Sequence, residues 1–180
     1  IDTVVAELSL DEDRVFMTGH SSGGFMSYSF ATMHPDKVAA IGPVAGLNIG
    51  RTKPKLPVSV ISFHGMADDV VAYDREHGRG AKYGGMPSAI DSAAAFAKHN
   101  ACAAEPIRTE LHKGKVLLDT WVDGTSATRV ELYSLKGWKH GWPSGRAKVS
   151  ATDLIWKFFE DHARAPAGKQ GAKAKRKKAR

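Results

Sequence analysis

Cysteine is almost absent from this chain, which holds one thiol, Cys102, in 180 residues. A single cysteine cannot form an internal disulfide, so cysteine content leaves the redox compartment of the protein undecided. Long hydrophobic runs are absent as well: Val38 to Val44 is among the longest, far short of the roughly 20 apolar residues of a membrane span. Ile1-Asp2-Thr3 lacks the basic and apolar regions of a signal peptide. The patterns H-E-x-x-H and C-x-x-C are missing too, so no metal site is predicted.

Composition and charge separate a neutral body from a basic tail. The chain is 42% apolar and 25% charged, as in ordinary globular domains, and its length suits one domain. The net charge is +7, but residues 165–180 contain seven cations and no acidic residue; the rest balances at 19 basic and 19 acidic residues. We expect residues 164–180 to be a disordered, solvated tail, and we favour this over a specific nucleic-acid site.

Strand-like and helix-like segments alternate along residues 1–163. This alternation predicts an α/β fold with a mostly parallel sheet flanked by helices. The predicted strands are 14–18, 38–44, 58–63 and 128–135, with a small hairpin formed by 107–111 and 116–121. The predicted helices are 1–9, 25–34, 88–100 and 151–162, and the glycine-rich residues 78–87 are expected to be a mobile loop.

The segment Gly19-His20-Ser21-Ser22-Gly23 matches G-x-S-x-G between a predicted strand and a predicted helix. This is the setting of a nucleophile elbow, a turn so sharp that the serine is strained and the flanking positions must be small. Ser21 is the predicted nucleophile, and the Ser22 N–H at the helix start is the predicted oxyanion donor. Ser22 as nucleophile is disfavoured, because His20 would then lead the motif in place of a glycine.

The other two members of a catalytic triad should follow in the order acid, then base, each after a strand. Asp68 and Asp69 come just after the strand that ends at Phe63, and spacing alone does not separate them. His140 lies in a glycine-punctuated loop before the last helix, where a general base belongs.

We predict structural or substrate-binding roles for four other side chains near these motifs. We expect His64 to hold the acid loop and His20 to point away from the site. Trp138 and Trp142, on either side of the predicted base, are candidates for lining a substrate acyl pocket.

Three separated segments together resemble the polyhydroxybutyrate depolymerase and feruloyl esterase group of α/β-hydrolases. The segments are Asp11 to Gly24 around the elbow, His64 to Tyr73 (H-G-x-x-D-x-x-V-x-Y), and Gly137 to Pro143 (G-x-x-H-x-W-P). The resemblance implies a serine esterase that needs no cofactor. Its substrates would be polyhydroxyalkanoates or feruloyl and acetyl esters of polysaccharides, small or polymeric. It also assigns the acid to Asp68, and it implies a secreted or periplasmic protein.

The chain departs from the group's pattern ahead of the elbow. Members carry an H-G-containing loop there that donates a second oxyanion N–H, and nothing in this chain corresponds to it. We therefore expect residues 1–163 to be the C-terminal portion of an α/β-hydrolase domain, without its N-terminal strands and with impaired activity. Two alternatives are a prolyl-oligopeptidase-type serine peptidase and a non-catalytic, degenerate hydrolase acting as a binding module. The oligomeric state is left open.

Overall fold

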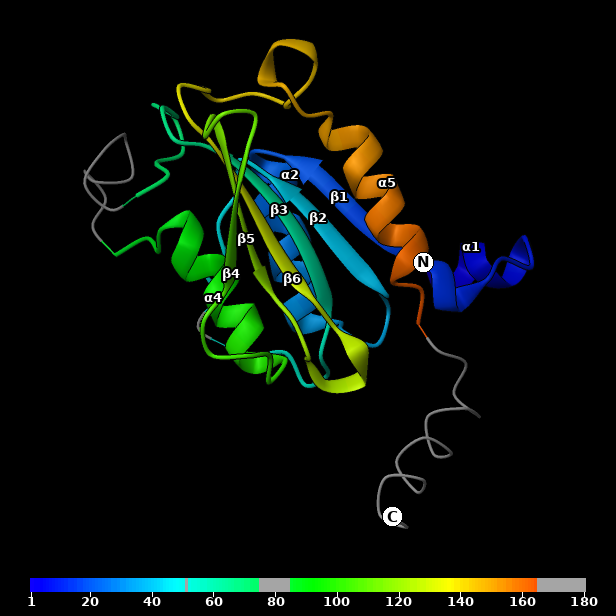
Figure 1. The fold of residues 1–180 in the computed structure, drawn as a ribbon. Coiled ribbons are helices and arrows are strands. Elements are labelled where there is room, and N and C mark those ends of the chain that lie inside the picture. Colours follow the sequence, from blue (N-terminus) through cyan, green and yellow to red (C-terminus); the bar gives the residue numbers. More distant parts are fainter. Residues whose placement is uncertain (51, 75–84, 165–180) are drawn as a thin grey trace.

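The computed structural model describes residues 1–50, 52–74 and 85–164, and its centre is one six-stranded sheet (Figure 1). The strands lie in the order β1-β2-β3-β6-β5-β4. The first four in this order are parallel to one another: β1 (Phe16–His20), β2 (Ala40–Val44), β3 (Ser59–Gly65) and β6 (Val130–Leu135). The hairpin of β4 (Ile107–Leu111) and β5 (Val116–Trp121) continues the sheet antiparallel to β6.

Helices cover both faces of this sheet. α2 (Ser22–Met33) and α4 (Ala89–His99) lie on one face and α5 (Ala151–Asp161) on the other, while the short α1 (Asp2–Glu7) lies near the end of α5 (Figure 1). Within the described part of the chain, 3-10 turns are also present at Glu12–Arg14, Thr125–Ala127 and Gly145–Ala147. α4 begins with a capping box between Ser88 and Asp91, which satisfies N–H groups that a helix start leaves free.

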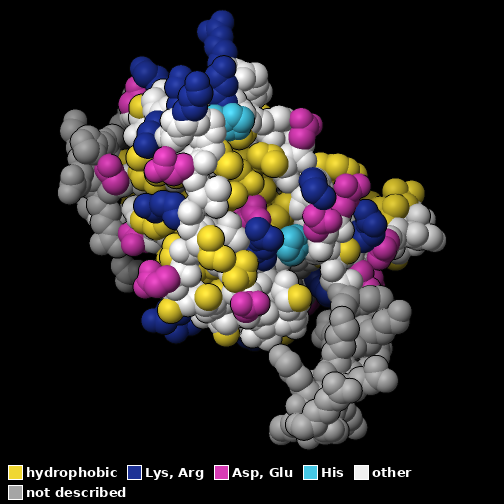
Figure 2. All heavy atoms as spheres, in the orientation of Figure 1, with side chains coloured by type: hydrophobic (Ala, Val, Ile, Leu, Met, Phe, Trp, Pro, Cys, Tyr) yellow, Lys and Arg dark blue, Asp and Glu magenta, His cyan; other side chains and the backbone are white. Residues whose placement is uncertain are grey.

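The core is divided by the sheet into two apolar clusters. Alternation along β3 sends Val60 into the cluster beneath α2 and α4, and Ile61 and Phe63 into the cluster beneath α5. On the α5 face, Phe63 stacks on Tyr133 with ring centroids 4.7 Å apart. In Figure 2 hydrophobic side chains show in the middle of this face, so α5 covers it only in part.

The predicted α/β architecture with a mostly parallel sheet flanked by helices is confirmed, and two details differ. α2 begins at Ser22 and not at Phe25, so the helix follows the serine turn directly. The predicted small hairpin belongs to the main sheet, because β5 pairs with β6 along its whole length. Among the described residues, no helix is long and apolar enough to cross a membrane. Of the predicted tail at 164–180, only Arg164 is described, and it is bonded to the body: its N–H donates to the Asp13 carbonyl at 2.9 Å and its guanidinium to the Val38 carbonyl at 3.1 Å. Residues 165–180 and most of the predicted loop at 78–87 lie outside the described residues.

Candidate active site

Ser21 occupies a sharp turn between the end of β1 and the start of α2. Its backbone has φ 55° and ψ −117°, a region that a non-glycine residue enters only when the surrounding structure holds it there. The Ser21 N–H donates to the Val44 carbonyl at 2.9 Å, which ties the turn to the end of β2. Ser22 is the first residue of α2, where a helix N–H has no partner within the helix. This is the predicted elbow geometry.

The two motif glycines are not equally constrained by this turn. A Cβ atom on Gly19 would lie 2.7 Å from the Gly23 backbone, closer than real Cβ contacts come. A Cβ on Gly23 would meet nothing within 4 Å. The expectation that both flanking positions must be small is therefore correct for Gly19 and wrong for Gly23, because only Gly19 has the neighbouring backbone in its Cβ direction.

Asp68 lies in the loop after β3 and its side chain is fully buried (0% exposed). Its Oδ1 accepts the N–H groups of Val70 and Val71 at 2.9 and 2.8 Å. Its Oδ2 accepts the Nδ1–H of His140 at 2.8 Å. A carboxylate held in this way fixes the imidazole in the tautomer that leaves Nε2 free to take a proton.

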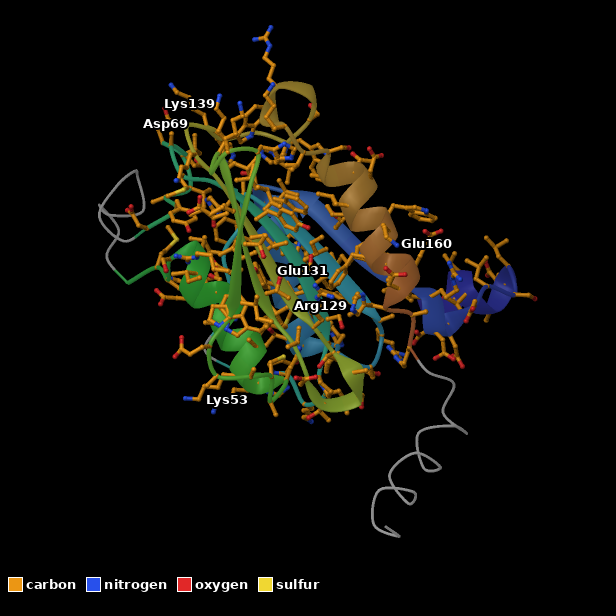
Figure 3. All side chains as sticks on the ribbon, in the orientation of Figure 1. Lys53, Asp69, Arg129, Glu131, Lys139 and Glu160 are labelled. Atoms are coloured by element: carbon orange, nitrogen blue, oxygen red, sulfur yellow. The ribbon has the colours of Figure 1, made fainter. Side chains whose placement is uncertain are left out.

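Asp69, which spacing could not distinguish from Asp68, faces the surface. Its side chain is 67% exposed and lies 3.9 Å from the ammonium of Lys139, itself 75% exposed. Figure 3 shows the two side chains beside each other at the outer edge of the molecule. An ion pair so exposed contributes little. Asp68, and not Asp69, therefore contacts the imidazole.

Backbone hydrogen bonds join the acid loop to the loop that carries His140. The Met66 N–H donates to the Leu135 carbonyl at 2.9 Å, and the Ala67 N–H to the Trp138 carbonyl at 3.0 Å. Gly65 makes this approach possible, since a Cβ there would overlap the Trp138 carbonyl oxygen. The pairing of β3 with β6 thus sets the distance between Asp68 and His140, although 72 positions separate them in the chain.

His64 spans the acid loop, as predicted. Its Nε2–H donates to the Val71 carbonyl at 2.8 Å and lies 3.5 Å from Oδ2 of Asp68. Burial lowers the pKa of His64 below the ordinary histidine value, so the ring is neutral at neutral pH. Because His64 is neutral, it places an N–H dipole beside the Asp68 carboxylate and does not compete with His140 as a cation for that carboxylate.

His20 does not point away from the site, and that expectation is wrong. Its ring lies against His140, with centroids 4.6 Å apart and planes inclined by 46°. Alternation along β1 contains the signal that was missed: Phe16 packs on Phe159 of α5, so His20, four residues on, shares the α5 face. The His140 loop leads into that same helix.

Trp138 and Trp142 flank His140 and are half-buried against the cluster beneath α5. The Trp138 indole N–H donates to the Gly141 carbonyl at 3.1 Å, closing the His140 loop on itself. The Trp142 indole N–H donates to Oγ1 of Thr152 in α5 at 3.0 Å. Both donors are therefore used within the chain, and any contact with a ligand would use the ring faces.

A serine in a strained turn between a strand and a helix of a mostly parallel sheet is typical of α/β-hydrolases. Acetyl xylan esterase from Aspergillus awamori matches the fold with a TM-score of 0.59, 15% identity, and coverage of 87% of this chain and 63% of that one. The crystal structure of esterase PE8 matches with a TM-score of 0.51 and 16% identity, covering 89% and 56%. At such identities the likeness shows the fold alone.

The family is shown by the sequence comparison. The esterase PHB depolymerase family matches residues 1–135, and the chain belongs to that family. A probable feruloyl esterase C of Aspergillus terreus is 29% identical over 160 residues, 88% of this chain and 54% of that protein. The bifunctional acetylxylan esterase/xylanase XynS20E of Neocallimastix patriciarum is 35% identical over 79 residues, 43% of this chain and 12% of that protein. The chain thus spans about half the length of the feruloyl esterase it matches.

Proposed function

We propose that this chain carries the catalytic triad of a carboxylic ester hydrolase, with Ser21 as nucleophile, His140 as base and Asp68 as acid. The observation that supports it most is the 2.8 Å bond from His140 to a fully buried carboxylate. This pair lies at the carboxyl ends of the parallel strands, the same edge at which Ser21 takes its strained conformation. Membership of the esterase family supports the chemistry independently of this geometry.

In the proposed reaction, Nε2 of His140 takes the hydroxyl proton of Ser21 as its Oγ attacks the ester carbonyl carbon. The oxyanion that forms accepts the Ser22 N–H at the start of α2. The imidazolium then gives its proton to the departing alkoxide, which leaves an acyl group on Ser21. A water molecule, deprotonated by the same imidazole, releases the acid and restores the serine. Asp68 stays ionised throughout and stabilises the imidazolium.

The proposed substrates are feruloyl or acetyl esters of polysaccharides, or polyhydroxyalkanoates. The names of the relatives support the first two acyl groups, since feruloyl esterases and an acetylxylan esterase are among them. We further propose that Trp138 and Trp142 contact the acyl group with their ring faces. Export from the cell is part of the same proposal, and it rests on the family resemblance.

A fluorophosphonate probe, which bonds covalently to an activated serine hydroxyl, tests the nucleophile without knowledge of the natural ester. We expect the probe mass on the peptide that contains Ser21, its loss in Ser21→Ala, and its retention in Ser22→Ala, because the Ser22 backbone N–H survives that change. Hydrolysis of p-nitrophenyl acetate and butyrate should follow the same pattern. Labelling that depends on Ser22 and not on Ser21 would overturn the assignment.

The same experiment separates the alternative functions. A chain that reacts with the probe and cleaves peptide p-nitroanilides, but hydrolyses no ester, would be a serine peptidase. A folded chain that neither reacts with the probe nor cleaves any ester would be a binding module.

A further inference from the structure

The ring of His20 is in direct contact with the proposed base. Its centroid lies 4.6 Å from that of His140 and the planes are inclined by 46°, so the two rings are in tilted contact. His20 ends β1 and immediately precedes Ser21, while His140 comes from the loop after β6. The contact therefore connects the nucleophile turn to the base loop, two parts of the proposed triad that are far apart in the chain.

A hydrogen bond from Nε2 does not explain the position of the His20 ring. Its Nε2 is buried and has no hydrogen-bond partner among the residues that the structure describes. Leaving such an atom unpaired is unfavourable by about 1–3 kcal/mol in general. What joins His20 to His140 is therefore the tilted contact between the two aromatic rings. Burial, and then the proximity of His140, lower the pKa of His20, so its ring is neutral at neutral pH.

The other described charged and titratable groups around His140 do not contact it with an aromatic ring, as His20 does. The acid loop contributes the Asp68 carboxylate, whose Oδ2 lies 2.8 Å from Nδ1 of His140, and β3 contributes the neutral His64, whose Nε2 lies 3.5 Å from the same oxygen. Lys139, the neighbour of His140 in its own loop, lies near Asp69 at the surface. Among the described ring contacts, the only one that His140 makes is with His20.

We propose that His20 is a positioning residue whose neutral ring face stabilises His140 in its protonated form. This rests on the proposed function, in which His140 carries a proton only between its two proton transfers. A cation beside an aromatic face is attracted by the ring quadrupole, more strongly where water is excluded. His140 is only 16% exposed, so the interaction is partly shielded from solvent. His20, the residue before the nucleophile, thus favours the imidazolium form of His140, which is present while the tetrahedral intermediate is present.

Two substitutions of similar size separate the ring face from simple packing. His20→Phe keeps an aromatic face, whereas His20→Leu keeps the apolar cover and removes the face. We expect the NMR titration of the His140 Cε1–H to show about two- to five-fold weaker proton binding in the leucine variant than in the phenylalanine variant, the range of a typical cation–π contact. With esters, kcat should fall by a similar factor in the leucine variant while KM stays the same.

The control is His34→Leu, because His34 packs on Phe30 within the α2 region and does not contact His140. It should leave the His140 titration unchanged. If the leucine variant at position 20 does not fold, His20→Gln replaces it as the variant without a ring. Equal titration midpoints in the Phe and Leu variants would overturn the proposal. This readout needs no turnover, so a chain that hydrolyses no ester refutes the proposed function and leaves the test of His20 intact.

Discussion

Replacing Asp68 by asparagine is the change that tests the triad most directly. The asparagine oxygen can still accept the N–H groups of Val70 and Val71 in place of Oδ1. The amide NH₂ then takes the position of Oδ2, where it faces the Nδ1–H of His140. Two donors cannot bond, so the imidazole is expected to move its proton to Nε2 and accept from the amide. In that tautomer His140 cannot take the Ser21 proton.

The expected loss is therefore almost entirely catalytic. The equivalent change in a serine protease triad lowers kcat by about four orders of magnitude, which corresponds to about 5 kcal/mol of activation free energy. Stability should change far less, because the loop keeps its two backbone bonds. Asp68→Ala would differ: it leaves buried donors without an acceptor, each at about 1–3 kcal/mol.

The assay is initial-rate hydrolysis of p-nitrophenyl acetate, with thermal unfolding of the same samples. Asp69→Asn is the matched control, since Asp69 is 67% exposed and only 3.9 Å from Lys139. It should retain nearly the wild-type rate, because the Asp69 side chain lies at the surface and the carboxylate that contacts His140 is that of Asp68. An Asp68→Asn protein within ten-fold of the wild-type rate, or an equal loss in both variants, would refute the assignment of the acid.

Three further predictions follow from the same geometry. Gly19→Ala should lower the free energy of unfolding by about 1–3 kcal/mol, because the added Cβ would lie 2.7 Å from the Gly23 backbone. Gly23→Ala should be neutral or slightly stabilising, because a Cβ there meets nothing within 4 Å. Thermal unfolding compares the two variants, and equal melting temperatures would contradict this reasoning. The folded protein holds the His64 proton more weakly than the unfolded chain does, so stability should fall as the pH drops below about 6.5, by at most about 1.4 kcal/mol per pH unit for this group. Urea unfolding of His64→Gln at pH 7.5 and 5.5 should show a shallower loss than wild type, and an unchanged slope would refute the role of burial. Trp142→Ala should reduce activity on aromatic esters more than on acetyl esters if its ring face contacts the acyl group, and equal losses on both would remove it from the substrate site.

The order of strands and helices was predictable because each segment carries its own pattern. β3 is buried along its whole length and reads as a continuous strand, and α5 shows one apolar stripe against the sheet. The elbow was predictable for a similar reason, since the G-x-S-x-G letters need only the strand before and the helix after them. The hairpin was recognised, but its attachment to β6 was not, because strand pairing across the chain is not a local property.

The residues themselves determined which side chains could serve as nucleophile, acid and base, since serine, carboxylate and imidazole in that order leave few candidates. Tertiary structure decided between adjacent candidates. Asp68 is turned inward by the Val70 and Val71 N–H groups while Asp69 remains in solvent. It also decided that His20 meets His140, because the approach of the β6 loop to the end of β1 depends on the packing of the whole sheet against α5. The local sequence pattern determines which helix or strand a residue belongs to. Which side chains that residue contacts is determined by tertiary packing.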